Sequence, residues 1–461
     1  MAGLIDGSSR LFKTHGYRRC LQYGVSLAAL FLYSPIANAQ QSTVTNIPGI
    51  SVDASGATTT TGGYATAANY QTPVASMGPL GNTPILETPA SVTIVPQDLM
   101  VNMQMQTVND TLSYLPSVEI RDQQGFEISR PQSRGFQSTI AQNTRLDGLN
   151  IIGTTVIATD NLSGIEVLNG FGGALYGPET PAGVFNYMLA QPTAKPLVRV
   201  IESFQSDSTF TEQGDFAGTT ADGKVGYRLN VVQGNGASFA PQSNVDRTLG
   251  SVLFDFHLND STTLETYYSH YATDITGLPG SIVYDSGKST VLPKATNPTE
   301  MGLGQPGAGA DLISDTGLVK LIHVINQDWS FEIGGLYENA IRNLWGITNT
   351  MTNNSGDYTV TKNFNAIPHY TIGSNEAALN GHVLLLGFEN DVSLGTNGFI
   401  NGQHSNRNSI SQTLGTSNLA DPEVFSSESV PNTGGQYKSG SLFEQSIITA
   451  DTLHLNDQWA V

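Results

Sequence analysis

Beyond Pro196 the sequence alternates between apolar and polar residues with a period of two. The clearest run is "VGYRLNV" at residues 225–231, and residues 252–258 and 329–334 repeat the pattern. This period places the apolar side chains on one face of a β-strand and mostly polar ones on the other. The alternation therefore predicts an antiparallel sheet, in either a soluble sandwich or a transmembrane barrel.

The connections between these strands favour the barrel. On one side the predicted turns are tight, at Asp222-Gly223, Leu258–Ser261 and Asn326–Asp328. On the other side the predicted connections are long and polar, at residues 272–316, 342–374 and 398–437. Short turns at one end and long loops at the other are typical of outer-membrane barrels.

The N-terminus has the three parts of a secretory signal. A basic region precedes the apolar run Val25–Leu32 and the small-residue cleavage site Ala37–Ala39. We therefore predict a signal peptide at residues 1–39, followed by a flexible linker rich in Gly, Ala, Thr and Ser at residues 40–80. Cleavage would remove Cys20, the only cysteine, so the exported chain is expected to have no disulfide.

Composition excludes several classes of function. The formal net charge is −19 and only 13% of residues are charged, so few cations are present to neutralise phosphates, and we expect no nucleic-acid partner. Acidity of this kind is most simply explained by solvated loops. The eight histidines show neither i, i+4 pairs nor clusters with carboxylates. We predict no catalysis, no cofactor and no metal ligands.

Residues 81–195 predict a compact α+β domain. We expect a helix over Thr107–Tyr114, ended by Pro116, because Val108, Leu112 and Leu115 share one helical face. The short strands are expected near residues 92–95, 118–121, 143–146 and 165–168.

The glycine-rich stretch "EVLNGFGGALYGPETPAGVFNYM", residues 166–188, first suggests a nucleotide cradle after a strand. A dinucleotide fingerprint would need glycine at position 175, where Leu175 stands. The helix that would hold the phosphates is interrupted by Pro178 and Pro181. We therefore expect no nucleotide.

The same stretch resembles the most distinctive segment of the plug domain of TonB-dependent outer-membrane receptors, the siderophore-receptor group in particular. The matching residues are Ile165, Glu166, Val167, Leu168, Gly170, Leu175, Tyr176, Gly177, Pro181, Gly183, Asn186 and Tyr187. Four further family features are similar and stand in the same order: Thr88–Val92, Leu112–Val118, Arg134-Gly135-Phe136 and Leu146-Asp147-Gly148.

The resemblance implies a membrane protein with an α+β plug domain at residues 81–195. An antiparallel transmembrane β-barrel of the 22-stranded type would follow, with its N-terminal portion at residues 196–461. It implies a receptor in the cell outer membrane, surrounded by lipid, that takes up ferric siderophores. The energy would come from TonB and its inner-membrane energy-coupling proteins, which pull on a short N-terminal segment.

The resemblance also implies site residues. The TonB box is expected at Ile50, Ser51, Val52, Asp53 and Ala54, with residues 43–47 as a second candidate, because an added strand pairs mainly through its backbone.

The family's ligand-binding apices correspond here to Arg134, Gly153 and Thr154, in or beside the predicted apical loops 137–142 and 151–155. Arg134 would meet an anionic chelate, or alternatively form a structural salt bridge within the plug. The barrel tyrosines Tyr267, Tyr268 and Tyr271 are expected in the interfacial girdle instead.

The chain departs from the family in three places in this segment, one of which is Ala190-Gln191, where the family usually has a basic pair before a proline. Ser163-Gly164 and Asn169 stand where the family commonly has charged residues, including arginines that pair with carboxylates of the barrel wall, so that latch is either missing or rebuilt. The family's P-G-G is Pro181-Ala182-Gly183 here.

Length is the largest departure. The 266 residues from Pro196 to Val461 (461 minus 195) accommodate roughly ten to twelve strands, about half of a closed barrel. We therefore expect an open curved sheet around a plug, from the N-terminal part of a longer receptor or from a truncated, non-transporting copy. The alternative functions are a TonB-dependent receptor for cobalamin, haem or an oligosaccharide, and a passive porin or adhesin.

Overall fold

The computed structural model divides the chain into two units, Met1–Ala54 and Ser55–Val461. All the residues it describes lie in the second unit: 70, 72–76, 78, 81–88, 90–120, 130–170, 172–205, 208–240, 242–297, 302–408, 410–426, 432–456, 459 and 460. The predicted signal peptide, most of the linker and the predicted TonB box therefore lie outside the described residues. Among the described residues, no helix is both long and apolar enough to cross a bilayer.

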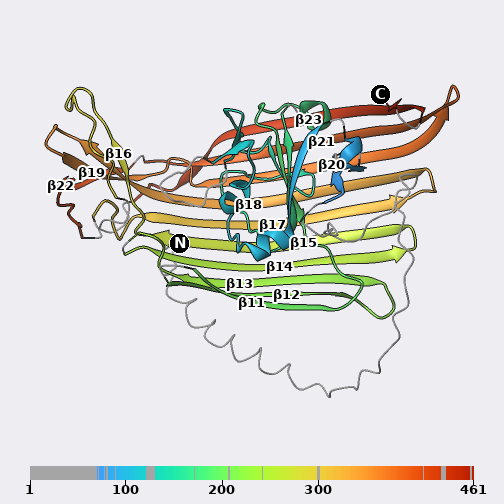
Figure 1. Cartoon of the computed structure of the whole chain (residues 1–461), viewed down its shortest axis with the longest axis horizontal. Coiled ribbons are helices and arrows are strands. Elements are labelled where there is room, and N and C mark those ends of the chain that lie inside the picture. The colour runs from blue at the N-terminus through green and yellow to red at the C-terminus, as the bar shows by residue number, and fades with distance from the viewer. Residues whose placement is uncertain are drawn as a thin grey trace, which may run out of the picture. The chain divides into compact units, whose positions relative to one another are not determined.

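A large antiparallel sheet, which we call the wall, occupies the C-terminal part of this unit (Figure 1). Each strand of its main path pairs with the next, in the order β11-β12-β13-β14-β15-β17-β18-β20-β21-β23-β24. The strands are β11 Leu197–Gln205, β12 Thr209–Thr219, β13 Val225–Gly236, β14 Asn244–Asn259, β15 Thr262–Thr276, β17 Gly309–Val324, β18 Trp329–Met351, β20 His369–Leu385, β21 Phe388–Asn406, β23 Gln436–Asn456 and β24 Trp459–Ala460. The described sheet is open, with β11 and β24 at its two ends, which confirms the prediction of an open antiparallel sheet.

On parts of the wall, the distribution of side chains is the reverse of that in a soluble protein, with apolar residues exposed and polar residues buried. On β13 the apolar Tyr227, Leu229 and Val231 are exposed, whereas the polar Arg228 and Asn230 are buried. Other strands also carry exposed apolar residues on the outward face, such as Val319 on β17, whereas their inward positions hold both polar and apolar buried residues, such as Ser314 and Leu318. Exposed apolar residues along the outward face require an apolar environment there, as in a membrane-embedded sheet.

The prediction of long polar loops is largely wrong, because the strands continue into those residues. β18 continues to Met351, and residues 342–374 form β19 (Asp357–Phe364) and the start of β20 instead of one loop. With β16 (Ser281–Val283) and β22 (Ser411–Asn418), β19 extends the sheet beside the end of β18. The extension has its own apolar cluster, which includes the buried Ile347, Met351, Tyr358 and Val360.

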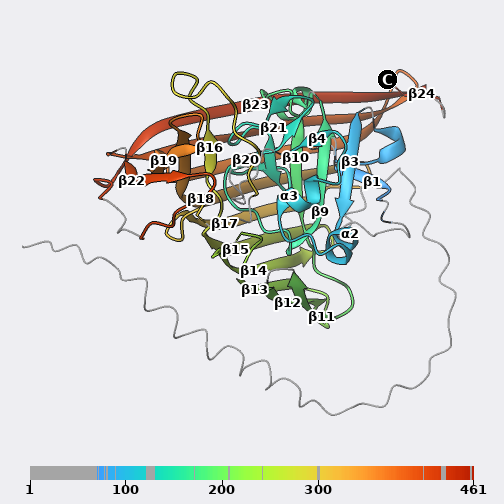
Figure 2. The same cartoon turned by 60° about the vertical axis from the view of Figure 1, so that its left-hand side comes forward.

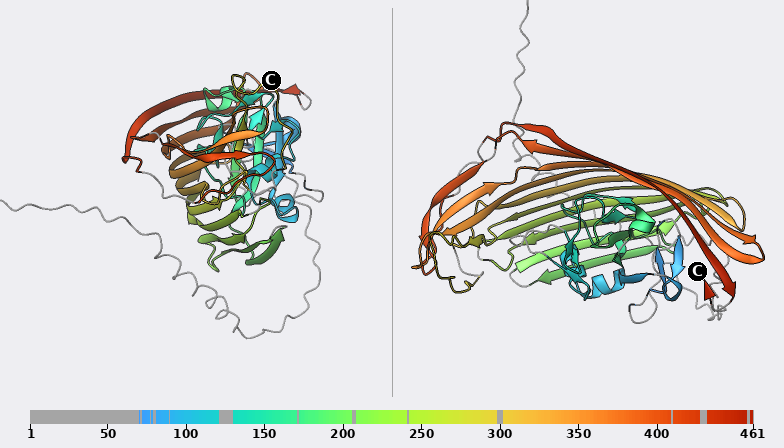
Figure 3. Two further views of the ribbon diagram at one scale, coloured as in Figure 1. Left: turned by 90° about the vertical axis from the view of Figure 1, so that its left-hand side faces the viewer. Right: turned by 90° about the horizontal axis from the view of Figure 1, so that it is seen from above.

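A smaller five-stranded sheet lies on the concave side of the wall (Figures 2 and 3). We call residues 81–195 the plug. The sheet order is β3-β9-β10-β7-β8, in which only β10 and β7 are parallel. The strands are β3 Ser91–Pro96, β7 Thr144–Leu146, β8 Leu149–Asn150, β9 Leu162–Asn169 and β10 Val184–Leu189.

Three helices accompany this sheet: α2 Gln97–Asn102, α3 Val108–Leu112 and α4 Gly173–Tyr176. Helix α3 is the predicted helix, and it begins where Thr107 and Asp110 form a capping box. The remaining plug elements are β2 Asn82–Pro84, the 3-10 helix η4 Ile85–Glu87, β4 Val118–Glu119, β5 Gln132–Ser133 and β6 Phe136–Gln137. Strand β2 pairs with β1 (Val74–Ser76), so an ordered hairpin reaches back into the predicted linker.

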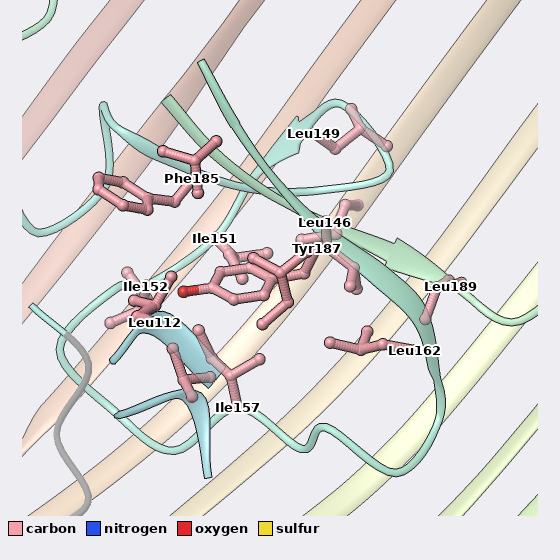
Figure 4. Packing of buried hydrophobic residues seen from close by; sticks show 14 of the residues in the cluster. Leu112, Leu146, Leu149, Ile151, Ile152, Ile157, Leu162, Phe185, Tyr187 and Leu189 are labelled. Carbon is pink, nitrogen blue, oxygen red and sulfur yellow. The ribbon is translucent and has the colours of Figure 1, made fainter. Parts of the chain in front are cut away.

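The plug core continues into the wall. Leu112, Ile152, Leu162 and Tyr187 pack together at the centre of the plug (Figure 4). The same cluster includes inward wall residues from β14, β15, β17, β18, β20 and β21, among them Leu253, Tyr267, Leu318, Leu336, Tyr370 and Phe399. One apolar core therefore spans both parts, and its burial holds the plug on the inward face of the wall.

Candidate functional site

The turn Asp147-Gly148 joins β7 to β8 and organises the centre of the plug. Both residues have positive φ, 45° and 89°, as a two-residue hairpin turn requires. The Asp147 carboxylate accepts a hydrogen bond from the Leu189 amide (2.9 Å), and the Gly148 amide donates one to Asn186 Oδ1 (3.0 Å). Two motifs far apart in sequence therefore meet at this turn.

The same turn lies against the wall. Lys320 Nζ on β17 donates to the Asp147 carbonyl (2.9 Å), and a Cβ on Gly148 would lie 2.8 Å from a carboxylate oxygen of Glu376 on β20. Burial raises the pKa of the Asp147 carboxyl to about 6, although Lys320 and the Leu189 amide lower it.

The glycine-rich stretch forms structure within the plug and no cradle for phosphate. Helix α4 has only four residues, and it ends at Gly177, where φ is 87°. At Gly183, φ is 85° and a Cβ would lie 2.2 Å from the Leu168 carbonyl oxygen, so β10 can approach β9 only with glycine there. Ala182, which replaces a family glycine, is buried and does not have positive φ.

Arg145 links this stretch to the turn. Its guanidinium is fully buried and donates to the carbonyls of Gly148 (2.7 Å) and Tyr176 (3.3 Å). It also lies 4.2 Å from the centroid of the Tyr176 ring, a cation–π contact. Desolvation lowers the pKa of Arg145, and the nearby acidic groups only partly offset it.

Glu166 lies on the central strand β9 and is 2% exposed. Its carboxylate accepts a long hydrogen bond from Asn186 Nδ2 (3.4 Å). Burial raises the pKa of Glu166 to about 7, while the hydrogen bonds from Asn186 and the Ser76 backbone lower it. The predicted motif residues Glu166 and Asn186 are therefore direct neighbours in the sheet.

Arg134 lies in the turn of the β5–β6 hairpin and is exposed. Both Arg134 and Gly135 have positive φ, 53° and 80°, and Phe136 follows with half of its surface exposed. A Cβ on Gly170 would lie 3.0 Å from a guanidinium nitrogen of Arg134, so the side chain lies over the end of β9. Within the described part of the chain Arg134 forms no ion pair, so the structural salt bridge considered as its alternative is not formed there.

Residues 151–155, predicted as an apical loop, are buried in the structure. Ile152 and Thr154 are buried, and the Gly153 amide donates to the Ile140 carbonyl (2.6 Å). The cause is the wall, because the Ile152 amide donates to a carboxylate oxygen of Glu338 on β18 (2.7 Å). Gly153 and Thr154 therefore lie in the packed interior, whereas Arg134 is exposed at its turn.

The predicted girdle role is wrong for two of the three barrel tyrosines and stays a prediction for the third. Tyr268 is exposed on the outward face, whereas Tyr267 and Tyr271 are buried on the inward face. The Tyr267 hydroxyl accepts a hydrogen bond from Asn161 Nδ2 (2.7 Å), which ties β15 to the plug. The strand period of two would have separated the inward tyrosines from the outward one, because adjacent residues such as Tyr267 and Tyr268 must face opposite sides.

The wall residues that contact the plug carry no motif that would predict their role. Lys320 and Glu338 stand out only as charged residues at inward positions of otherwise uncharged stretches. No group of three or more His, Cys, Asp or Glu in the described ranges is placed to hold a metal ion.

Comparison with known proteins agrees with this arrangement. Residues 84–184 match the family described as TonB-dependent Receptor Plug Domain. The chain is similar to the ferrichrome outer membrane transporter/phage receptor of Escherichia coli, with 28% identity over 200 residues, 42% of this chain and 27% of that protein. It is also similar to the ferric-pyoverdine 358 receptor of Pseudomonas putida, with 23% identity over 346 residues, 71% of this chain and 41% of that protein. The matches thus span less than half of these relatives.

Two solved structures share the fold. The ferric preacinetobactin receptor of Acinetobacter baumannii has a TM-score of 0.73 at 15% identity, covering 84% of this chain and 58% of that one. The closed form of a ferric-catecholate import receptor from E. coli K12 has a TM-score of 0.70 at 20% identity, covering 86% and 57%. These findings identify residues 84–184 as a plug domain of the TonB-dependent receptor family, packed against an antiparallel wall that shares the fold of the two solved receptors.

Proposed function

We propose that the chain belongs to an outer-membrane receptor that takes up ferric siderophores through a barrel gated by residues 81–195. Transport would be energised by TonB, which pairs with an N-terminal segment, for which residues 50–54 remain the candidate. The observation that carries the proposal is the plug itself, because a domain packed across the inward face of the wall must move before a large solute can pass.

The nature of the relatives supports the choice of cargo. The similar curated proteins are receptors for ferrichrome, ferric pyoverdine and ferrioxamine, and the similar structures include receptors for ferric preacinetobactin and ferric catecholates. These are chemically different iron chelates, so the relatives support ferric siderophores as a class. They do not select one chelate.

Arg134 is the candidate contact for the cargo within the plug. It is exposed, cationic and free of ion pairs with described residues, so it can donate charge-assisted hydrogen bonds to an anionic chelate. Gly153 and Thr154 are enclosed, and contact between them and the cargo requires the segment to move.

Uptake of iron-55 carried by single siderophores tests the proposal in an iron-starved host that lacks other receptors for them. The intact gene should restore uptake of at least one ferric siderophore, and loss of TonB should abolish it. Uptake that persists without TonB would favour a passive pore. Restored uptake of cobalamin or haem in place of any ferric siderophore would favour another cargo.

A further inference from the structure

We propose that the wall holds the plug through three buried cations, Arg228, Arg247 and Lys320, each of which donates to a backbone carbonyl of the plug domain. We call them the wall cations. They come from three different strands, β13, β14 and β17, and each is less than a tenth exposed. Each also has a carboxylate partner, so its charge is balanced where it lies. The inference depends on the plug and the wall and on no cargo.

Lys320 holds the central turn of the plug. Its ammonium group donates to the Asp147 carbonyl and forms ion pairs with Glu332 and Glu376, all at 2.9 Å. In the register of the wall, Lys320 lies opposite Gly334, which in turn lies opposite Glu376. Because Gly334 has no side chain, Lys320 can reach across the intervening strand to Glu376.

Arg247 holds the segment in front of helix α3. One guanidinium nitrogen donates to the Gln106 carbonyl at 3.1 Å, and another forms an ion pair with Asp160. Asp160 belongs to the plug and lies just before strand β9. A single wall side chain therefore connects two plug segments that are 54 residues apart in sequence.

Arg228 holds the segment that leaves the plug. It pairs with Asp215 on the neighbouring strand through two hydrogen bonds, of 2.9 and 2.7 Å. A third nitrogen donates to the Gln191 carbonyl at 2.9 Å, and the side-chain oxygen of Gln97 on α2 lies 3.4 Å from the guanidinium. The guanidinium is thus fixed by its own sheet and directed at the plug.

Ser163-Gly164 and Asn169 left open whether the family's latch between plug and wall is missing or rebuilt. The three contacts share a chemistry that answers this question. The resemblance leads one to expect plug cations paired with wall carboxylates. The buried plug cation Arg145 donates to carbonyls of the plug itself, whereas the cations that bridge to the other part stand on the wall and each donates to a plug carbonyl oxygen. A carbonyl accepts a hydrogen bond whatever side chain its residue carries, so the latch tolerates change in the plug sequence. The latch is thus rebuilt in the opposite sense, with the cations on the wall and the hydrogen-bond acceptors on the plug.

Hydrogen exchange of the purified chain in outer-membrane lipid vesicles tests this inference. Arg247→Met and Lys320→Met should each make exchange in the plug strands β7 to β10 about tenfold faster, because charge-assisted hydrogen bonds are lost. Exchange in the wall strands should stay unchanged. Lys224→Met is the matched control, since Lys224 lies in an exposed turn of the same sheet.

Two more variants separate the latch from a general folding defect. Lys320→Arg keeps the charge and should restore slow exchange in the plug. The triple variant Lys320→Met, Glu332→Gln, Glu376→Gln also removes the charge of both carboxylates that form ion pairs with Lys320, and it should still exchange fast in the plug. Plug exchange at the wild-type rate in Arg247→Met and the triple variant would overturn the inference, and so would equal acceleration in wall and plug. No siderophore is used, so neither result depends on the proposed cargo.

Discussion

Glu166 places a carboxyl group at the centre of the plug sheet, and burial raises its pKa to about 7. In the unfolded chain the pKa of a glutamate is about 4.3, so the folded plug binds this proton more tightly than the unfolded chain does. The contribution of Glu166 to the free energy of unfolding is therefore most favourable below pH ~4.3 and is lost as the pH rises through about 7.

Glu166→Gln should remove this dependence. At pH 8 the variant should unfold with a free energy higher than the wild type by about 1–3 kcal/mol, and the difference should vanish near pH 4. Urea unfolding of the purified protein between pH 4 and 8 measures it. Glu119→Gln, at an exposed plug position, is the control. A difference independent of pH would show that the carboxyl of Glu166 is not what titrates.

Tyr187 packs among apolar side chains of the plug core (Figure 4). It is fully buried, and its hydroxyl has no hydrogen-bond partner among the described residues. Removing that oxygen while keeping the ring should stabilise the plug by about 1 kcal/mol, because a buried polar group without a partner is costly. Tyr187→Phe is the variant, and Tyr187→Ala should instead destabilise the plug by roughly 3 kcal/mol through the cavity it leaves. Destabilisation by Tyr187→Phe would show that the hydroxyl has a partner after all.

Two plug hairpins allow a matched comparison of turns. Gly148 and Gly135 have similar φ, 89° and 80°, but a Cβ on Gly148 would meet Glu376 at 2.8 Å whereas one on Gly135 has no atom within 4 Å. Both substitutions to alanine should cost about 1 kcal/mol of backbone strain. Only Gly148→Ala should also loosen the plug on the wall, seen as faster hydrogen exchange in β7 and β8. Equal exchange in the two variants would contradict the contact with Glu376.

The elements differ in how far the sequence predicts them. The period of two predicts the wall strands, and turn residues predict the tight connections near Asp222-Gly223 and Asn326–Asp328, because these residues adopt turn conformations readily. The turn Leu386-Gly387 was not predicted. Leu386 has φ of 55°, which leucine rarely adopts, and the apolar run before it conceals the break.

The site residues also differ in how far the sequence predicts them. The motifs predict Asp147, Gly148 and Asn186 as plug residues, because each belongs to a short stretch of sequence that forms a turn or strand. The contacts of Lys320 and Glu338 with the plug depend on the register of non-neighbouring strands, and the sequence does not contain that register in any local pattern. For the same reason, the burial of Gly153 became visible only with the wall in place.

For the molecule as a whole, the apolar outward face of the wall predicts that this face contacts lipid. Val319 is about half exposed there, next to the inward Lys320 on the same strand. Val319→Arg should lower the amount of protein assembled in the outer membrane, since arginine on the lipid face costs about 2–4 kcal/mol near the bilayer midplane. Val319→Leu should assemble normally. Normal assembly of Val319→Arg, measured in isolated outer membranes, would contradict a lipid-facing position.

Cross-linking of the plug to the wall tests the central claim most directly. A Cβ on Gly177 would lie 2.9 Å from the Cβ of the inward Ser446, and Cβ atoms in disulfides lie about 3.5–4.5 Å apart, so a small shift suffices. The neighbouring Ile447 faces outward and is 81% exposed. With cysteine at 177 and 446, oxidation of intact outer membranes should form a disulfide, and with cysteine at 177 and 447 it should not. No cross-link at 446, or equal cross-linking at both positions, would contradict a plug seated on the inward face of the wall.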